Sequence, residues 1–251
     1  EFDVESLNAA AMKDILSGRT ACHSCPIACG RRVDVPEYNL KGVAGPEYQT
    51  IAAFGTNLLI PDLKVVTRMN RLCNQYGMDT ISLGSVLAFS ALLRDNGVLD
   101  DGLKWGDGDR AIDLVSNIAN REGLGDELAE GSMRFAEKHN ASELALHVRG
   151  LEIPFHDPRA FAGMATVYTV AARGASHMEG DMYTVDMGVD VRDIGIVSGE
   201  PCENQGKGIM AAKAQDYRAF FDCIIMCHFA LIPTDSIVGL LNQALGTSIG
   251  V

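Results

Sequence analysis

The sequence Cys22-His23-Ser24-Cys25-Pro26-Ile27-Ala28-Cys29-Gly30-Arg31 places three cysteines at C-x2-C-x3-C spacing. This spacing puts three sulfurs on one tight loop, which is how a chain presents thiolates to a single metal centre. Four thiolates usually complete such a centre, whether it is iron–sulfur or zinc. The chain has seven cysteines, so a fourth ligand has to come from Cys73, Cys202, Cys223 or Cys227.

The spacing of this loop also bears on the kind of centre. Zinc sites normally combine paired C-x2-C units, or a cysteine pair with a histidine pair. A C-x2-C-x3-C triple followed by a distant single cysteine is more typical of an iron–sulfur cluster. Pro26 stiffens the loop, and backbone N–H groups there can donate to cluster sulfurs. The pattern favours a cluster, with a zinc-binding module as the alternative.

Composition narrows the class of protein. With 251 residues the chain can bury a sizeable core, and its net charge of −12 argues against nucleic acid as a partner, because phosphate binding needs clustered Lys and Arg. No apolar run reaches the length of a membrane span, so no membrane is expected. The acidic start at 1–5 resembles no secretion leader, and without a Met it suggests a chain that begins mid-protein or after processing. An odd cysteine count fits a reducing compartment, so we expect a cytoplasmic protein.

Helical periodicity dominates the chain. Pro61-Asp62 opens a helix with one apolar stripe, and Gly77 closes it. A helix over 6–17 would end at Gly18 and lead into the cysteine loop. Further helices are predicted at 80–93, 109–120, 126–139, 160–172, 204–229 and 234–245, with irregular chain at 39–49 and 178–202.

These elements predict a mostly α fold made of two helical domains. Asn140, Ser142 and Gly150 interrupt the periodicity, so we place the boundary there. The first domain, 1–147, carries the cysteine loop, and the second, 148–251, carries the later cysteines.

Polar side chains at the ends of elements are candidates for chemistry. Glu47, Asp79 and His177 each follow a glycine-containing break, where catalytic side chains are often placed. Taken singly, each is equally explained as a surface or capping residue. Asp222 and Cys227 would not share a face of one helix, but a helix that ends between them would let both point into one cleft. The alternative is that Cys223 and Cys227 are core cysteines four residues apart.

Taken together, these pieces resemble the tungsten-containing aldehyde ferredoxin oxidoreductase family, in the family's order from about residue 20 to 230. The matching segments are 22–31, Gly45-Pro46-Glu47-Tyr48, 72–82, Gly123-Leu124-Gly125-Asp126, Arg149-Gly150-Leu151-Glu152-Ile153-Pro154, Asp157-Pro158-Arg159, Arg173-Gly174-Ala175-Ser176-His177 and 222–227.

The resemblance implies a role for each matching residue. Cys22, Cys25 and Cys29, with Cys227 as the fourth ligand, would hold a [4Fe-4S] cluster. The family's two pterin-binding stretches look like 74–79 and 222–227. Asn74, Asp79 and Asp222 would accept hydrogen bonds from the pterins of a tungsten or molybdenum bis-pterin cofactor. Glu47 and His177 look like the pair beside the metal that handles protons and orients the carbonyl substrate.

The implied reaction is oxidation of an aldehyde to a carboxylic acid, with electrons passed through the cluster to ferredoxin. An aryl acyl-thioester reductase of the same family and a non-catalytic iron–sulfur or zinc module are the alternatives. A homodimer is compatible with the resemblance.

The sequence departs from the family pattern in three places. Asn74 replaces an Asp in the first stretch, Ile225 replaces a Gly in the second, and no E-x-x-H motif for an interface iron occurs around 65–72. The family's N-terminal β-rich domain, which forms one wall of the cofactor site, is not part of the chain. We therefore expect that the chain by itself does not hold the pterin cofactor tightly, an expectation that stoichiometric tungsten in the isolated chain would contradict.

Overall fold

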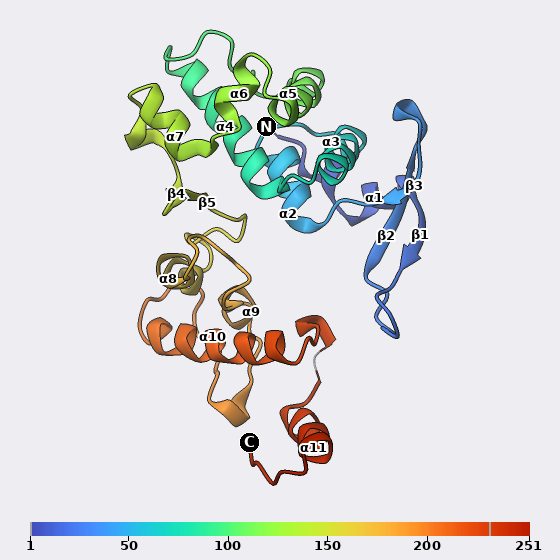
Figure 1. The fold of residues 1–251 in the computed structure, drawn as a ribbon, viewed down its shortest axis with the longest axis vertical. Helices are drawn as coiled ribbons and strands as arrows, with labels where there is room; N and C mark the ends of the chain where they lie inside the picture. Colours follow the sequence, from blue (N-terminus) through green and yellow to red (C-terminus); the bar gives the residue numbers. More distant parts are fainter. Residues whose placement is uncertain (1, 231) are drawn as a thin grey trace. The chain divides into compact units, whose positions relative to one another are not determined.

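The computed structural model describes residues 2–230 and 232–251. By its internal contacts the chain divides into two compact units, Glu1–Phe155 and His156–Val251, called unit 1 and unit 2 below. Helices make up most of the regular structure in both units (Figure 1), which confirms the mostly α prediction.

Unit 1 contains seven of the α-helices and all of the strands in the described part of the chain. Its elements are η1 Val4–Leu7, α1 Ala9–Ile15, β1 Leu16–Thr20, β2 Gly30–Val35, η2 Pro36–Tyr38, β3 Leu40–Ala44, α2 Tyr48–Ile51, η3 Ala52–Thr56, α3 Leu63–Tyr76, α4 Thr80–Asp95, α5 Gly108–Asn120, α6 Leu124–Leu128, α7 Gly131–Lys138, η4 Ser142–Leu144, β4 His147–Val148 and β5 Leu151–Glu152.

The helices of unit 1 begin and end at residues that the sequence marks. The Asp62 carboxylate accepts a hydrogen bond from the Lys64 amide at 2.7 Å and caps α3. Gly77, with φ of 73°, ends the same helix in the left-handed conformation that glycine adopts without strain. Asp107 caps α5 in the way that Asp62 caps α3. These caps explain why the predicted bounds of α3 and α5 agree with the structure.

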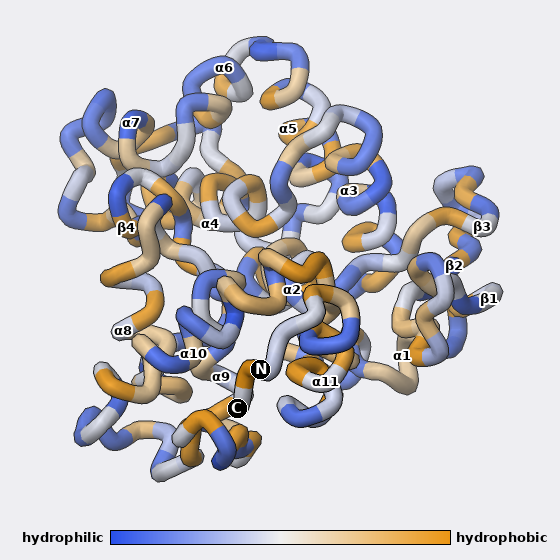
Figure 2. Tube along the Cα trace, turned by 60° about the horizontal axis from the view of Figure 1, so that its bottom comes forward, coloured by the Kyte–Doolittle hydropathy of each residue, from blue (hydrophilic) through white to orange (hydrophobic). Residues whose placement is uncertain are grey.

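The core of unit 1 lies between α3, α4, α5 and the π-helical turn η3. The sequence of α4 is apolar on nearly every side, and Figure 2 shows its tube largely in the hydrophobic colour. Gly84 lets α4 approach η3, since a Cβ there would lie 2.6 Å from the Ala53 Cβ. Phe54 and Leu87 are fully buried in this contact region. The core therefore fixes η3 and, with it, the segment that carries Glu47.

A small antiparallel sheet, in the order β1-β2-β3, corrects two predictions. The expected helix over 6–17 stops at Ile15, and Leu16–Thr20 pairs with β2 instead, with a register shift between Leu16 and Gly18. Part of the segment 39–49 pairs too, as β3. Pairing partners far along the chain decide these strands, and such partners are not visible in local periodicity.

The predicted helix over 126–139 is two helices, α6 and α7. The chain turns at Gly131, whose φ of 84° is left-handed, so one continuous helix cannot form there. Gly125 lies against the backbone of Asn117, which brings α6 close to α5.

Unit 2 is built on α10, the longest helix in the described part of the chain. Its elements are α8 Ala162–Val170, α9 Met182–Asp186, η5 Arg192–Ile194, α10 Lys207–Cys223, η6 His228–Ala230 and α11 Thr234–Leu245. The expectation of irregular chain with little core at 178–202 is wrong in part, since α9 forms there and Met182, Val185 and Ile196 are buried. The apolar residues of this segment are isolated among many acids, so their spacing shows no periodicity from which a buried core could be predicted.

The division between the units falls after Phe155. His147 pairs with Glu152 in the hairpin β4–β5, and the buried Glu152 carboxylate accepts hydrogen bonds from the Ser132 amide and hydroxyl, both at 2.8 Å. These contacts keep the chain up to β5 in unit 1. The domain boundary between 147 and 148 stays a prediction.

Within the described residues, no single helix has the length and apolar content needed to cross a membrane. The helices α3 and α4 meet that test only as a pair, and they are bent from each other by 119°.

Candidate functional site

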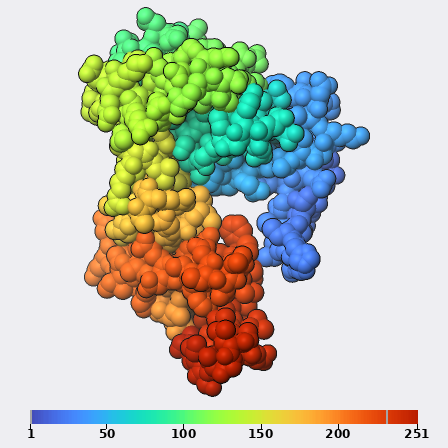
Figure 3. Space-filling model, viewed as in Figure 1, coloured from blue at the N-terminus to red at the C-terminus, as the bar shows by residue number. Residues whose placement is uncertain are grey.

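The three-cysteine loop is the tip of a β-hairpin. Strands β1 and β2 pair up to Thr20↔Gly30, so the loop 21–29 is closed at its base by the last pair of the ladder. Gly30 allows this close pairing, because a Cβ there would overlap the Thr20 hydroxyl oxygen and would force Thr20 to shift. In Figure 3 this tip, in blue, stands clear of the helices of unit 1. The sheet therefore holds the loop away from the core.

The loop itself is folded into tight turns. The Cys25 amide donates to the Cys22 carbonyl at 3.1 Å, and both Ser24 and Ala28 adopt left-handed conformations, with φ of 57° and 50°. Cys22 and Cys29 are exposed, Cys25 is half-buried, and none of the three is in a disulfide. All three thiols are therefore available as ligands on one short segment.

The donor chemistry of this loop fits a metal–sulfur centre. Thiolates are the ligands of iron–sulfur clusters and of many zinc sites, and three of the four that either centre requires are present. Within 2–230 and 232–251, no three His, Cys, Asp or Glu side chains already converge as a metal site. The three thiols would have to turn toward one another around an incoming ion or cluster.

Glu47 is held beside the base of the same hairpin. Its carboxylate forms an ion pair with Arg31, which lies two residues after Cys29. The Gly45 amide donates to the Arg31 carbonyl at 2.9 Å, so the backbone joins the two segments as well. The Glu47 side chain is 68% exposed, which leaves it accessible to a substrate. The sequence did not indicate Arg31 as its partner.

Asn74 and Asp79 flank the C-terminal end of α3. Asn74 is exposed on the last turn, and Asp79 is exposed just before α4. One oxygen of Asp79 is engaged, since it accepts a hydrogen bond from the Ser82 amide at 2.7 Å and caps α4. The capping role that was the alternative for Asp79 is therefore real, and it leaves the second carboxylate oxygen for a ligand.

Asp222 and Cys227 lie on either side of the end of α10. The helix ends at Cys223, between the two residues, so they are not tied to opposite faces of one helix. Asp222 is 62% exposed, with its Oδ1 3.3 Å from Arg218 Nε, and Cys227 is exposed. Ile225 has a left-handed φ of 54°, in the position where glycine was expected from the resemblance. The alternative of two core cysteines is excluded, because Cys223 and Cys227 are both exposed.

His177 is half-buried in unit 2, with its ring centre 5.5 Å from that of His156. His156 stacks on Tyr183, with ring centres 3.8 Å apart and planes 5° from parallel. Burial, with a smaller contribution from the charge of His177, lowers the pKa of His156 to about 4. His156 is therefore neutral near pH 7. Sequence reasoning missed this second histidine, although it stands in the proline-rich segment before Asp157-Pro158-Arg159.

The predicted site residues are thus divided between the units. Unit 1 holds Cys22, Cys25, Cys29, Glu47, Asn74 and Asp79, and unit 2 holds His177, Asp222 and Cys227. The structure brings Glu47 next to the cysteine hairpin. The four-cysteine set and the pairing of Glu47 with His177 each join residues of different units and stay predictions.

Comparisons with known proteins give the class of this chain. A family profile described as "Aldehyde ferredoxin oxidoreductase, domains 2 & 3" matches residues 1–250. The tungsten-containing aldehyde ferredoxin oxidoreductases of Thermococcus kodakarensis and Pyrococcus furiosus are 34% and 33% identical to it, over 98% and 96% of this chain. The chain covers only 41% and 40% of those two proteins.

A solved structure gives the same fold. The active site complex BamBC of benzoyl coenzyme A reductase, in complex with 1,5-dienoyl-CoA, has a TM-score of 0.65 to this chain. The identity is 20%, and the match covers 87% of this chain and 38% of that one. The family profile and the two archaeal relatives place the chain in a class of oxidoreductases. More narrowly, the chain belongs to the aldehyde ferredoxin oxidoreductase family and corresponds to its domains 2 and 3.

Proposed function

We propose that the protein containing this chain oxidises aldehydes to carboxylic acids with a tungsten or molybdenum bis-pterin cofactor and passes the electrons through a [4Fe-4S] cluster to ferredoxin. Family membership and the names of the two archaeal relatives support this reaction. The observation that carries the proposal is the cysteine hairpin, which presents three available thiols beside the Arg31–Glu47 pair.

Each predicted residue has a role that its surroundings allow. Cys22, Cys25 and Cys29, joined by Cys227, would ligate the cluster. Asn74, Asp79 and Asp222 would accept hydrogen bonds from pterin amino and ring N–H groups, a task suited to exposed carboxylate and amide oxygens. When bound, the metal–pterin group would supply the two-electron redox chemistry that no side chain of the chain can supply.

The remaining task is proton transfer. An aldehyde and one water give the acid, two protons and two electrons, so the site needs a group that accepts protons from the attacking water. Glu47 suits this role, because it is accessible and Arg31 fixes its orientation. His177 would donate a hydrogen bond to the carbonyl oxygen and orient it for attack. A cytoplasmic location and a homodimeric assembly are part of the same proposal.

The first test is elemental and kinetic. The full-length protein, purified without oxygen, is expected to contain iron and tungsten or molybdenum and to reduce ferredoxin when given an aldehyde. The variant His177→Ala should lower kcat by about 10²- to 10³-fold, the usual cost of losing one hydrogen-bond donor to the reacting oxygen, while the cluster spectrum stays unchanged. His147→Ala is the control, because the ring of that half-buried histidine accepts a hydrogen bond from the Gly150 amide of its own hairpin turn. Unchanged turnover in the His177 variant would remove this residue from the mechanism.

The same preparation separates the alternatives. Turnover with an aryl acyl thioester and a low-potential donor, but not with aldehydes, would replace the aldehyde reaction with thioester reduction. Zinc as the only metal, or a cluster without turnover of either substrate, would indicate a non-catalytic module.

A further inference from the structure

Unit 2 contains a buried carboxylate that none of the proposed roles uses. Asp181 lies directly before α9 and is 5% exposed. Its backbone is fixed, because its carbonyl accepts hydrogen bonds from the Thr184 amide at 2.9 Å and from the Thr184 hydroxyl at 2.7 Å. Its Oδ2 lies 3.1 Å from Arg218 Nη1 and 3.3 Å from His228 Nδ1. The Asp181 Oδ2 atom thus contacts both the Arg218 guanidinium and the His228 ring.

Arg218 and His228 each lie next to a residue that is predicted to bind a cofactor group. Arg218 extends from α10, and its Nε lies 3.3 Å from Oδ1 of Asp222, the predicted pterin contact. This Nε–H is buried and makes no hydrogen bond in this geometry, so the contact between Arg218 and Asp222 is an ion pair without a hydrogen bond. His228 follows Cys227, the predicted cluster ligand, directly in the chain.

The His228 ring is seated by aromatic contacts as well. It meets Phe221 edge to face, with ring centres 5.3 Å apart, and Tyr217 at 5.9 Å. The contact with Asp181 also orients the His228 ring, because it sets the edge that carries Nδ1 toward the buried carboxylate. The position of His228 in turn limits where the Cys227 backbone can lie.

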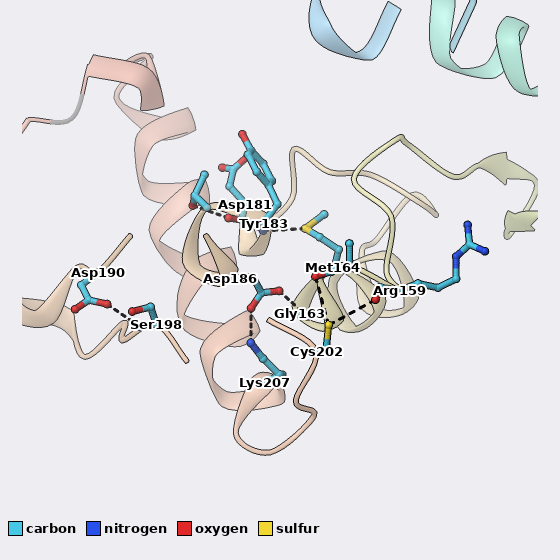
Figure 4. A network of polar contacts seen from close by, with 12 residues as sticks. Arg159, Gly163, Met164, Asp181, Tyr183, Asp186, Asp190, Ser198, Cys202 and Lys207 are labelled. Carbon is cyan, nitrogen blue, oxygen red and sulfur yellow. Dashed lines mark hydrogen bonds and ion pairs between the residues drawn. The ribbon is translucent and has the colours of Figure 1, made fainter. Parts of the chain in front are cut away.

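A second buried acid offers a contrast within the same unit. Asp186, five residues later, pairs with Lys207 of α10 and accepts a hydrogen bond from the Gly163 amide at 3.0 Å (Figure 4). Its contacts lead to the start of α8 and the start of α10, and to no predicted ligand. A buried ion pair adds little net stability, whereas removal of one partner is costly. A loss of stability on mutation therefore does not distinguish Asp181 from Asp186. The residues that each carboxylate contacts do distinguish them.

We propose that Asp181 is a positioning residue that fixes Asp222 through Arg218, and Cys227 through His228, in one arrangement for the cofactor groups. This inference rests on the proposed function, because Asp222 and Cys227 are ligands only under that proposal. Groups that orient metal ligands from behind commonly change metal affinity by about 10- to 100-fold when they are mutated.

The test compares Asp181→Asn with Asp186→Asn in the full-length holoprotein, prepared without oxygen. The measurements are the thermal unfolding midpoint, the rate at which an iron chelator removes iron, and the EPR spectrum of the reduced cluster. Both variants are expected to lose stability, since each removes the negative charge from a buried ion pair. Only Asp181→Asn should release iron about 10-fold faster and shift the EPR line shape. Asp181→Glu, which keeps the charge, should restore part of the iron retention.

Two outcomes would overturn the inference. Equal iron release in the two Asn variants would mean that Asp181 acts through general stability alone. If Asp181→Asn does not fold, His228→Ala is the second variant, because it leaves the Asp181–Arg218 pair intact; normal iron retention and an unchanged EPR spectrum in it would also reject the inference.

The proposed function fails in a different way. A wild-type protein without an iron–sulfur signal would reject the cluster assignment and, with it, the role of Asp181. A wild-type protein with a normal cluster, but with no difference between the two Asn variants, would reject only the role of Asp181.

Discussion

The ends of α3 and α10 are closed by the same kind of backbone hydrogen bond but have different residues at the critical position. At α3 the Met78 amide donates to the Cys73 carbonyl at 2.9 Å, and at α10 the Met226 amide donates to the Phe221 carbonyl at 3.0 Å. This six-residue closure needs a left-handed residue just before the donor. Gly77 fills that position at α3 with φ of 73°, and Ile225 fills it at α10 with φ of 54°.

The difference shows how each predicted pterin-binding stretch is held. Gly77 adopts its conformation without strain, so the end of α3 needs no outside support. A left-handed L-residue costs about 1–2 kcal/mol, so Ile225 requires its surroundings to impose the turn. Ile225 is 93% exposed and contributes no burial in return. We expect the buried residue Phe221, whose carbonyl receives the closing bond, to supply this support.

The largest expected effect comes from removing that support. Phe221→Ala should lower the free energy of unfolding by about 3–5 kcal/mol, because Phe221 is 1% exposed and packs against Tyr217 and His228. Chemical unfolding monitored by circular dichroism measures the loss. Phe220→Ala is the matched control on the same helix, since Phe220 is only half-buried. Equal losses in both variants would show that Phe221 has no special role at this helix end.

At α3, the residue equivalent to Phe221 is Cys73. Its contribution to the free energy of unfolding depends on pH. Burial, with a smaller contribution from Asp79, raises the pKa of the Cys73 thiol from its ordinary value of 9.0 to about 12. Between these values the unfolded state releases a proton that the folded state keeps. The free energy of unfolding therefore falls as pH rises through this window, by up to about 1.4 kcal/mol per pH unit, and the effect is absent below it.

Unfolding curves recorded on both sides of pH 9.0 measure this slope. The variant Cys73→Ala removes the thiol and should flatten the slope, whereas Cys223→Ala, at an exposed cysteine, should leave it as in the wild type. An unchanged slope in the Cys73 variant would assign the alkaline sensitivity to other groups.

Placing isoleucine at position 77 gives the end of α3 the same residue as the end of α10, and so tests the comparison directly. Gly77→Ile should destabilise unit 1 by about 1–2 kcal/mol, because the new side chain is forced into a left-handed conformation. No atom lies within 4 Å of the Cβ that such a residue would carry, so collisions do not add to the cost. Gly77→Asn is the control, since Asn tolerates this conformation better. Equal stability of the Ile variant and the wild type would mean that the turn can relax.

The reverse exchange has the smallest expected effect. Ile225→Gly relieves the strain at the end of α10, but glycine also gains more freedom in the unfolded chain, by about 0.4–1 kcal/mol. The net gain in the free energy of unfolding should therefore be below about 1 kcal/mol. The thermal unfolding midpoint of the isolated chain reports it, with Ile224→Gly as the control at the neighbouring residue, whose φ is −93°. A loss of stability would show that Ile225 makes a contribution other than strain.

The sequence predicted those helices whose ends carry their own signals. Asp62 and Gly77 define α3, and the start signal at Pro233 gives α11 the predicted bounds, Thr234–Leu245. Strand β1 was missed because Gly18 looks like a helix stop, while the partners of this strand in β2 lie beyond the cysteine loop. The break at Gly131 was missed because the apolar spacing continues across it.

The site was predictable as a list of residues but not as a set of contacts. Thiol spacing identified Cys22, Cys25 and Cys29, and the structure confirms that they share one loop. The partner of Glu47 could not be predicted, since Arg31 is paired with it only through the sheet. Asp181 and Asp186 were read as loop acids, because their cations, Arg218 and Lys207, lie far along the chain on α10.

The β1–β2 ladder that ends at Thr20↔Gly30 also limits which insertions and deletions this hairpin can accept during evolution. Successive side chains of a strand point to opposite faces, so a slip of one residue between β1 and β2 would turn the cysteine loop over. A single-residue insertion or deletion in either strand would therefore redirect all three thiols at once. Length changes that preserve the loop would have to occur two residues at a time, or in both strands together.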